Sequence, residues 1–171
     1  TKKYLDKSYF NITYTGNIGT GQPFENFCLV ANKIYVKNKN IIFNIFGEGK
    51  VKNQLIDDIK KFNNKNIKIF NYVNKSQLTG IYKESDALLL LLKNKKIFSM
   101  TIPSKFQNYL MFKKPILGWI TGQTAKIIEE SECGLTAYPG NIKKFESMIL
   151  KIYSLRKSKK YKKFCKNSYK L

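Results

Sequence analysis

Residues 99–122 read SMTIPSKFQNYLMFKKPILGWITG, and this pattern predicts a polar turn, a short helix and a buried strand in succession. Pro103 or Ser104 begins the helix, because proline suits a first helical turn and a serine hydroxyl accepts hydrogen bonds from free backbone N–H groups. One face of the helix is apolar, with the i, i+3, i+4 spacing of Phe106, Tyr109 and Leu110. The helix is expected to end at Lys113 and Lys114, ahead of Pro115.

The start of this helix is a candidate anion site. Residues 101–105 bring together free backbone N–H groups, the positive end of the helix dipole and the ammonium group of Lys105. This combination favours binding of phosphate or carboxylate. The alternative is a capped surface helix that carries its lysine by chance.

The same alternation of strand and helix continues along the chain. Strands are expected at residues 11–15, 41–46, 67–70, 87–92, 115–120 and 135–138. The segment at 87–92 is apolar throughout, which is typical of a strand covered by helices on both faces. A helix starting near Gly122 is expected to end at Gly134, and residues 94–98 are expected to form a basic loop. The predicted class is α/β: a Rossmann-like, doubly wound parallel sheet of about six strands with helices on both faces.

Right-handed crossovers place the carboxyl ends of all these strands at one edge of the sheet. The turn Gly16-Asn17-Ile18-Gly19-Thr20-Gly21 follows the first strand, and its glycines let the backbone turn tightly and approach a ligand. An ordinary strand-to-helix turn is the alternative for this segment. Tyr72 and Val73, the 94–98 loop and residues 103–105 reach the same edge, so a ligand site is predicted there, at the switch point in strand order.

Length and composition fit one domain that is large enough to have a real core. The chain has 171 residues, of which 43% are hydrophobic, and its longest apolar run is too short to span a bilayer. The net charge of +21 favours an anionic partner. Arg156 is the only arginine among 32 basic residues, as expected for the codon bias of an AT-rich genome. The scarcity of arginine disfavours specific nucleic-acid recognition.

The sequence lacks the residues that several common types of catalytic and metal site require. Cys28, Cys133 and Cys165 are isolated and odd in number, so disulfide and zinc frameworks are not expected and a reducing cytoplasm is the expected location. The absence of histidine excludes histidine-based triads. No Asp-x-Asp pair or Walker loop is present, so we expect neither a protein-bound metal nor a cofactor.

Lysines become much more frequent at residues 156–171, which are expected to form a basic C-terminal helix or tail. Tyr161, Phe164 and Cys165 have helical spacing among lysines. A basic amphipathic helix of this kind is suited to lie on an anionic membrane surface. The alternative is a solvated terminal helix whose basic character reflects codon bias.

Five segments in order carry a resemblance to a known family: ITYTGNIGTGQPF, NIFGEG, LTGIYKESDALLLLL, TIPSKFQNYLMFKKPILG and GQTAKIIEESECGLTAYPGN. They resemble the C-terminal, donor-binding domain of the GT-B glycosyltransferases, in particular the family-four retaining group and its colanic-acid and fucosamine transferases of bacterial surface-polysaccharide assembly. The resemblance covers residues 11–155. It implies that residues 1–10 are a linker from a missing N-terminal acceptor domain.

By this resemblance the sheet edge binds a UDP- or GDP-sugar. The diphosphate would contact Gly16, Asn17, Gly19, Ser104 and Lys105, with Lys105 as the catalytic residue. The nucleoside would contact Tyr72, Val73 and Asn108, and the transferred sugar would lie near Met100, Thr101 and Ile102. No metal is required, because positive charge and N–H donors suffice for a departing diphosphate.

The sequence also departs from the family pattern. Asn17 and Gln22 stand where the family usually has basic residues, and Met100 and Asn108 stand where it has two glutamates. Lys105 is therefore expected to carry more of the phosphate contact. Without the acceptor half, the chain is expected to be either a fragment or one subunit of a split enzyme, and to be inactive alone. Two alternatives stay open: a nucleotide-sugar 2-epimerase-like half-domain, and a non-enzymatic module that binds polyanions or membranes through its charge.

Overall fold

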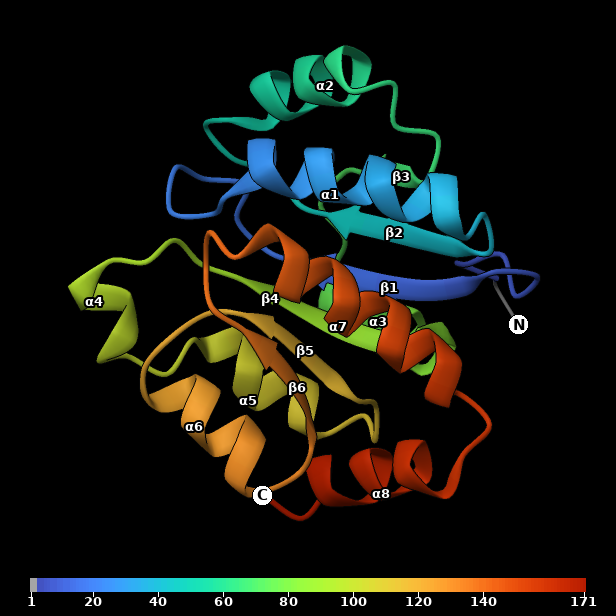
Figure 1. The fold of residues 1–171 in the computed structure, drawn as a ribbon, viewed down its shortest axis with the longest axis vertical. Helices are drawn as coiled ribbons and strands as arrows, with labels where there is room; N and C mark the ends of the chain where they lie inside the picture. Colours follow the sequence, from blue (N-terminus) through green and yellow to red (C-terminus); the bar gives the residue numbers. More distant parts are fainter. Residues whose placement is uncertain (1–2) are drawn as a thin grey trace.

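The sheet is built from six parallel strands in the order β3-β2-β1-β4-β5-β6. The computed structural model describes residues 3–171 (Figure 1). The strands are β1 (Phe10–Thr15), β2 (Ile41–Phe46), β3 (Ile67–Phe70), β4 (Ala87–Leu91), β5 (Ile116–Trp119) and β6 (Gly134–Ala137). The helices are α1 (Phe24–Lys37), α2 (Lys52–Lys61), α3 (Lys75–Glu84), α4 (Lys96–Ser99), α5 (Ser104–Leu110), α6 (Gln123–Glu130), α7 (Ile142–Leu155) and α8 (Lys159–Ser168). The predicted α/β class and doubly wound parallel sheet are confirmed, with strand bounds within two residues of those expected.

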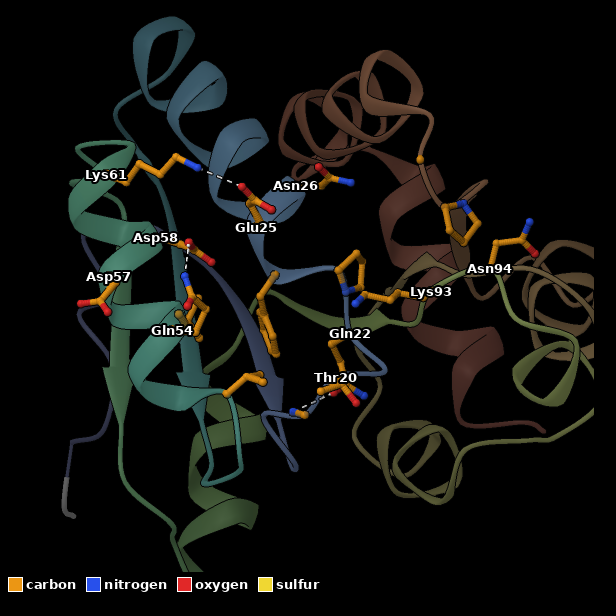
Figure 2. A pocket seen from close by; sticks show the side chains of 17 residues that line it. Thr20, Gln22, Glu25, Asn26, Gln54, Asp57, Asp58, Lys61, Lys93 and Asn94 are labelled. Carbon is orange, nitrogen blue, oxygen red and sulfur yellow. Dashed lines mark hydrogen bonds and ion pairs between the residues drawn. The ribbon is translucent and has the colours of Figure 1, made fainter.

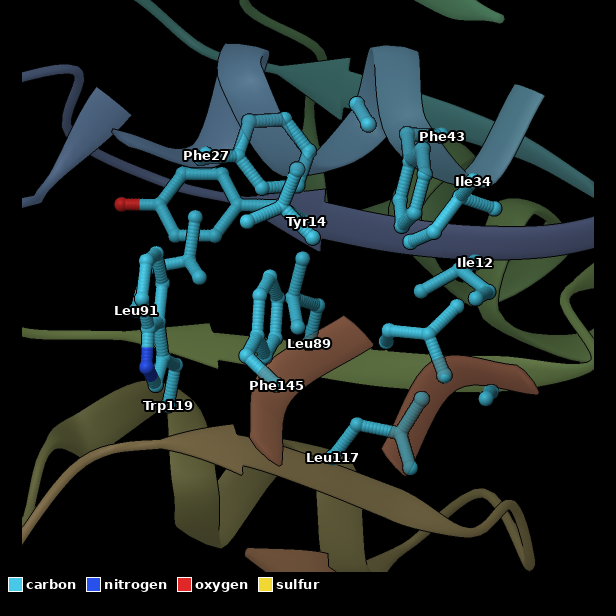
Figure 3. Close-up of a cluster of buried hydrophobic side chains, with 14 of the residues drawn as sticks. Ile12, Tyr14, Phe27, Ile34, Phe43, Leu89, Leu91, Leu117, Trp119 and Phe145 are labelled. Carbon is cyan, nitrogen blue, oxygen red and sulfur yellow. The ribbon is translucent and has the colours of Figure 1, made fainter. Parts of the chain in front are cut away.

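Two hydrophobic cores lie on opposite faces of the sheet because successive strand side chains point to opposite sides. In β4, Leu89 and Leu91 belong to the core under α1 and α7, whereas Leu88 and Leu90 belong to the core under α3, α5 and α6. The first core is rich in aromatic rings (Figure 3). Trp119 and Phe145 stack with their ring centroids 4.3 Å apart, so this pair joins α7 to the sheet.

The segment before β1 is attached to the domain. The backbone N–H groups of Tyr4 and Leu5 donate to the Glu84 carboxylate at 2.9 and 2.8 Å. Leu5 is buried beside Phe46 and Ile81. Residues 1 and 2 of the predicted linker lie outside the described residues.

The turn before β6 corrects the role expected for Gly134. Helix α6 ends at Glu130, and Glu132 adopts the positive φ of +49° that a helix-ending glycine was expected to supply. Gly134 is instead the first residue of β6, where an added Cβ would lie 1.8 Å from the Ile116 carbonyl oxygen. Close approach of β5 and β6 explains this glycine.

Two local expectations on either side of α5 were also wrong. Residues 96–98 belong to the helical turn α4, not to a loop, because the N–H groups of Phe98 and Ser99 donate to the Lys95 carbonyl oxygen. Helix α5 ends at Leu110, before the two lysines expected to close it, and Lys113 has a φ of +53°. No helix within residues 3–171 combines the length and apolar character needed to cross a bilayer.

Candidate functional site

A cavity of about 600 Å³ opens at the carboxyl edge of the sheet, above the junction of β1 and β4. This is the switch point, because the chain runs outward from it in both directions. Its walls come from the loops after β1, β2 and β3, from α3, and from the segment that joins β4 to α5. The predicted site residues that line it are Gly16, Asn17, Tyr72, Val73, Thr101, Ser104, Lys105 and Asn108. The structure thus brings together eight predicted residues from three separate stretches of the chain, 16–17, 72–73 and 101–108.

Buried hydroxyl groups bridge β1 and β4 next to the cavity, which Thr15 and Tyr82 line. Strands β1 and β4 pair only at Ile12–Ala87 and Thr13–Leu88. Beyond that point the Tyr109 hydroxyl bridges them, accepting from the Thr15 N–H at 3.1 Å and donating to the Leu89 carbonyl oxygen at 3.2 Å. The hydroxyls of Thr15 and Tyr82 lie 2.6 Å apart. Burial raises the pKa of both tyrosines, so they remain neutral and act as structural hydrogen-bonding groups.

One wall is the turn after β1, which is fastened to the turn after β2. The N–H of Gly16 donates to the Phe46 carbonyl oxygen at 2.9 Å, and the N–H of Ile18 donates to the Glu48 carbonyl oxygen at 2.9 Å. Gly16 has a φ of +124°, which favours glycine. A Cβ added at Gly47 would lie 1.9 Å from the Gly16 carbonyl oxygen. Glycine is therefore required at both positions for the two turns to meet.

Gly19, predicted to contact the diphosphate, lies differently. It is buried, its N–H donates to Gln22 Oε1 at 3.0 Å, and it lines a neighbouring cavity instead of the cavity described above. Gln22 borders both cavities. The Gln22 side chain thus occupies the Gly19 N–H, which was expected to be free to bind the diphosphate.

The ammonium group of Lys105 is the main cationic feature of the cavity. Its Nζ lies 3.9 Å from the centroid of the Tyr14 ring and packs against Gly16, where an added Cβ would approach it to 3.1 Å. No carboxylate within residues 3–171 forms an ion pair with it. Burial lowers its pKa to about 8. Lys105 is therefore a cation that lacks a counter-ion and faces the turn after β1.

Two of the predicted nucleoside residues, Tyr72 and Val73, line the cavity from the loop after β3, whereas the third, Asn108, lines it from α5, the helix that carries Lys105. Lys52 Nζ donates to Glu48 Oε1 at 2.6 Å, and this hydrogen bond is the main reason that the pKa of Glu48 is lowered. Tyr72 is 74% exposed, and its backbone N–H makes a small contribution to lowering the pKa of Glu48. Lys52 also donates to Asn71 Oδ1 at 2.9 Å. These contacts fix the edge of the cavity beside Tyr72.

The residues predicted near the transferred sugar are divided. Thr101 lines the cavity, and its carbonyl oxygen accepts from the Thr124 hydroxyl at 3.3 Å. Met100 and Ile102 do not line it; they are 68% and 39% exposed. Sequence reasoning missed several lining residues that lie next to predicted ones in the chain or in space, namely Thr15, Phe46, Gly47, Glu48, Leu78, Tyr82 and Leu92. Phe98 and Pro103 also line the cavity, and both belong to segments that were expected at this edge. The Gly47-Glu48-Gly49 turn was the available signal, since it follows a strand at the same edge.

A second cavity, of about 710 Å³, adjoins the first on the other side of Gln22 (Figure 2). Carboxylates from α1 and α2 lie on one side of it, and Lys93 and Asn94 lie on another side (Figure 2). Glu25 pairs with Lys61 at 2.9 Å, and Asp58 accepts from Gln54 Nε2 at 3.0 Å. Residues 3–171 contain no cluster of three or more His, Cys, Asp or Glu side chains placed to hold a metal ion.

Solved structures show the same fold. S. aureus TarM, in complex with fondaparinux, alpha-GlcNAc-glycerol and UDP, superposes with a TM-score of 0.77 at 15% identity over 99% of this chain and 33% of TarM. The C-terminal domain of the glycosyl transferase group 1 family protein LpcC from Francisella tularensis gives 0.73 at 18% identity, over 94% of this chain and 83% of that one. Anabaena HepE in complex with UDP-glucose gives 0.73 at 10% identity, over 95% of this chain and 43% of HepE.

This chain spans about a third of the length of TarM. None of the curated protein sequences matches it significantly. The family description "Glycosyl transferases group 1" matches residues 2–171. Since that match covers nearly all of the sequence, the chain belongs to the glycosyl transferases group 1 family.

Proposed function

We propose that this chain is the donor-binding half of a retaining glycosyltransferase and that the cavity above β1 and β4 binds a nucleotide-diphosphate sugar. The observation that carries the proposal is the Lys105 ammonium, which lacks a counter-ion and is held against the turn after β1. A diphosphate supplies the anion that this cation lacks. Structures of HepE with UDP and with UDP-glucose support a uridine nucleotide over a guanosine nucleotide.

The proposed role of each residue follows from its position around the cavity. Lys105, Ser104, Gly16 and Asn17 would hold the diphosphate, and Tyr72, Val73 and Asn108 would hold the nucleoside. Charge builds on the diphosphate as the sugar–oxygen bond breaks, so a positioned ammonium stabilises the transition state more than the ground state. This role makes Lys105 the proposed catalytic residue. Gly19, Met100 and Ile102 are proposed to act only after the chain rearranges around a bound donor.

The biological setting is also proposed. The resemblance favours transferases of the colanic-acid and fucosamine type, which act in surface-polysaccharide assembly at the inner face of a membrane. The acceptor glycan or lipid-linked sugar would bind to an N-terminal half, and residues 3–171 alone would not turn over. No metal or cofactor is proposed for donor binding. The family match favours sugar transfer over the 2-epimerase alternative.

Calorimetric titration of the chain with UDP, UDP-glucose and GDP tests this function. We expect saturable binding of uridine diphosphates and a loss of at least tenfold in affinity for Lys105→Met, as for removal of a hydrogen bond to a charged group. Lys39→Met is the matched control. Lys39 is exposed in the turn between α1 and β2 and does not line the cavity, so this variant should leave the affinity unchanged. Absence of binding by every uridine and guanosine diphosphate would refute the proposal.

A further inference from the structure

Helix α8 presents a continuous row of lysines to solvent. Lys159, Lys162, Lys163 and Lys166 follow the i, i+3, i+4, i+7 spacing of one helix face, and Lys170 continues the row just past the helix. All five are exposed. At 1.5 Å per residue the row is about 17 Å long.

The other face of α8 is anchored to the domain. Phe164 is 3% exposed and belongs to the core under α7. The Tyr161 hydroxyl donates to the Asp86 carbonyl oxygen at 2.5 Å, and Asn167 Nδ2 donates to the Ser131 carbonyl oxygen at 3.0 Å. The apolar face of α8, which was expected to be available to a membrane, thus packs against the domain. The lysines on the opposite face point to solvent.

Charge on this surface is almost uncompensated. Residues 147–171 contain nine basic residues and no Asp or Glu. Among the described residues, the only ion pair of the lysine row joins Lys163 to Glu132. Lys113 extends the cationic surface, with its Nζ 4.5 Å from the centroid of the Tyr169 ring. Tyr169 is 59% exposed, which suits an aromatic ring at a water–lipid interface.

We propose that this lysine face, formed by Lys113, Lys159, Lys162, Lys163, Lys166 and Lys170, docks the domain onto an anionic lipid bilayer by charge, without insertion of α8. A flat array of negative headgroups complements a straight row of ammonium groups. Nucleic acid fits less well, because the face has no arginine for bidentate phosphate or base contacts. The proposal does not depend on the donor site, which lies at the carboxyl edge of the sheet.

Vesicle co-sedimentation tests the proposal with the full chain. We expect binding to mixed phosphatidylcholine–phosphatidylglycerol vesicles, none to pure phosphatidylcholine vesicles, and release as salt is raised. The test variant replaces Lys159, Lys162, Lys166 and Lys170 with glutamine and keeps Lys163 with its ion pair. The matched control replaces four exposed lysines elsewhere, Lys33, Lys39, Lys60 and Lys65, with glutamine.

The lysine-face variant should lose at least tenfold in vesicle partitioning, whereas the control should keep it. Equal losses in both variants would show that net charge alone acts and would overturn the proposal, as would unchanged binding of the lysine-face variant or equal binding to uncharged vesicles. Tighter binding to homopolymeric RNA than to the anionic vesicles would also overturn it. Both variants should melt as folded proteins and bind UDP as the parent does, so a failed donor site gives a separate result.

Discussion

Tyr14 touches both sides of the candidate diphosphate site: its ring faces Lys105 Nζ at 3.9 Å, and its hydroxyl donates to the Asn17 carbonyl oxygen at 2.7 Å. The residue itself is fully buried in the core under α1. One core side chain therefore sets the position of the ammonium and of the turn after β1.

Tyr14→Phe and Tyr14→Leu separate these two contacts. The phenylalanine variant keeps the ring under Lys105 and loses the hydrogen bond to Asn17, so we expect a loss of about 1 kcal/mol in the free energy of unfolding and a modest loss of UDP affinity. The leucine variant also removes the cation–π contact and should weaken UDP binding further. Denaturant unfolding and calorimetry measure the two effects. Equal UDP affinity in all three proteins would exclude Tyr14 as a positioning residue.

The pH dependence of UDP binding should report the Lys105 pKa of about 8. Below that pH the free protein carries the ammonium group. Above it the group is neutral, so diphosphate binding must take up a proton and the apparent affinity falls as pH rises. Titrations between pH 7 and pH 9.5, in buffers of different ionisation enthalpy, measure the affinity and the proton uptake. A Lys105→Met protein with the same pH profile would contradict this account.

Lys105→Met should stabilise the unliganded fold. The pKa of Lys105 is lower in the folded chain than the ordinary value of 10.5, so the unfolded chain binds more protons between pH 8 and 10.5. The folded state bears the penalty of this buried charge in full below pH 8 and loses it as pH rises through that window. We expect a gain on the order of 1–3 kcal/mol at pH 7, seen as a higher melting temperature. The gain should shrink by pH 10.5, and a gain independent of pH would point to packing instead.

Gly47→Ala should damage both folding and UDP binding, because the added Cβ would lie 1.9 Å from the Gly16 carbonyl oxygen. Backbone cannot yield there without separating the turns after β1 and β2. Gly140→Ala is the control: it has a φ of +91° but no atom within 4 Å of the added Cβ. The control should lose only about 1 kcal/mol of stability and keep UDP affinity. Thermal melting and calorimetry on both proteins test the difference.

Tyr109→Phe should loosen the switch point. It leaves the Thr15 N–H without the acceptor that fills the gap between β1 and β4, which should cost about 1–3 kcal/mol of stability. Hydrogen exchange at the Thr15 amide should accelerate more than exchange at Thr13, which lies on the same side of β1 where β1 still pairs with β4. Equal exchange rates at Thr15 in the parent and variant would show that the Tyr109 hydroxyl does not stabilise the junction of β1 and β4.

The sequence predicted the order of elements well because each strand carries its own apolar pattern. It also placed Tyr72, Ser104 and Lys105 at one edge, since parallel strands end together. It could not place the Tyr109 hydroxyl between two strands, because that contact joins residues far apart in the chain. Gly134 was misassigned for a similar reason: the close neighbour that demands a glycine is Ile116, on another strand. The buried face of α8 was visible as a pattern, but the surface that covers it was not.

The unpaired ammonium of Lys105, which lines the candidate cavity, should also make occupancy of that cavity easy to detect. Any diphosphate that neutralises Lys105 removes an unfavourable buried charge as well as adding contacts, so binding should register strongly as heat resistance. A melting-temperature screen of many nucleotide sugars could then rank donors for this chain without a known acceptor and before any turnover assay exists.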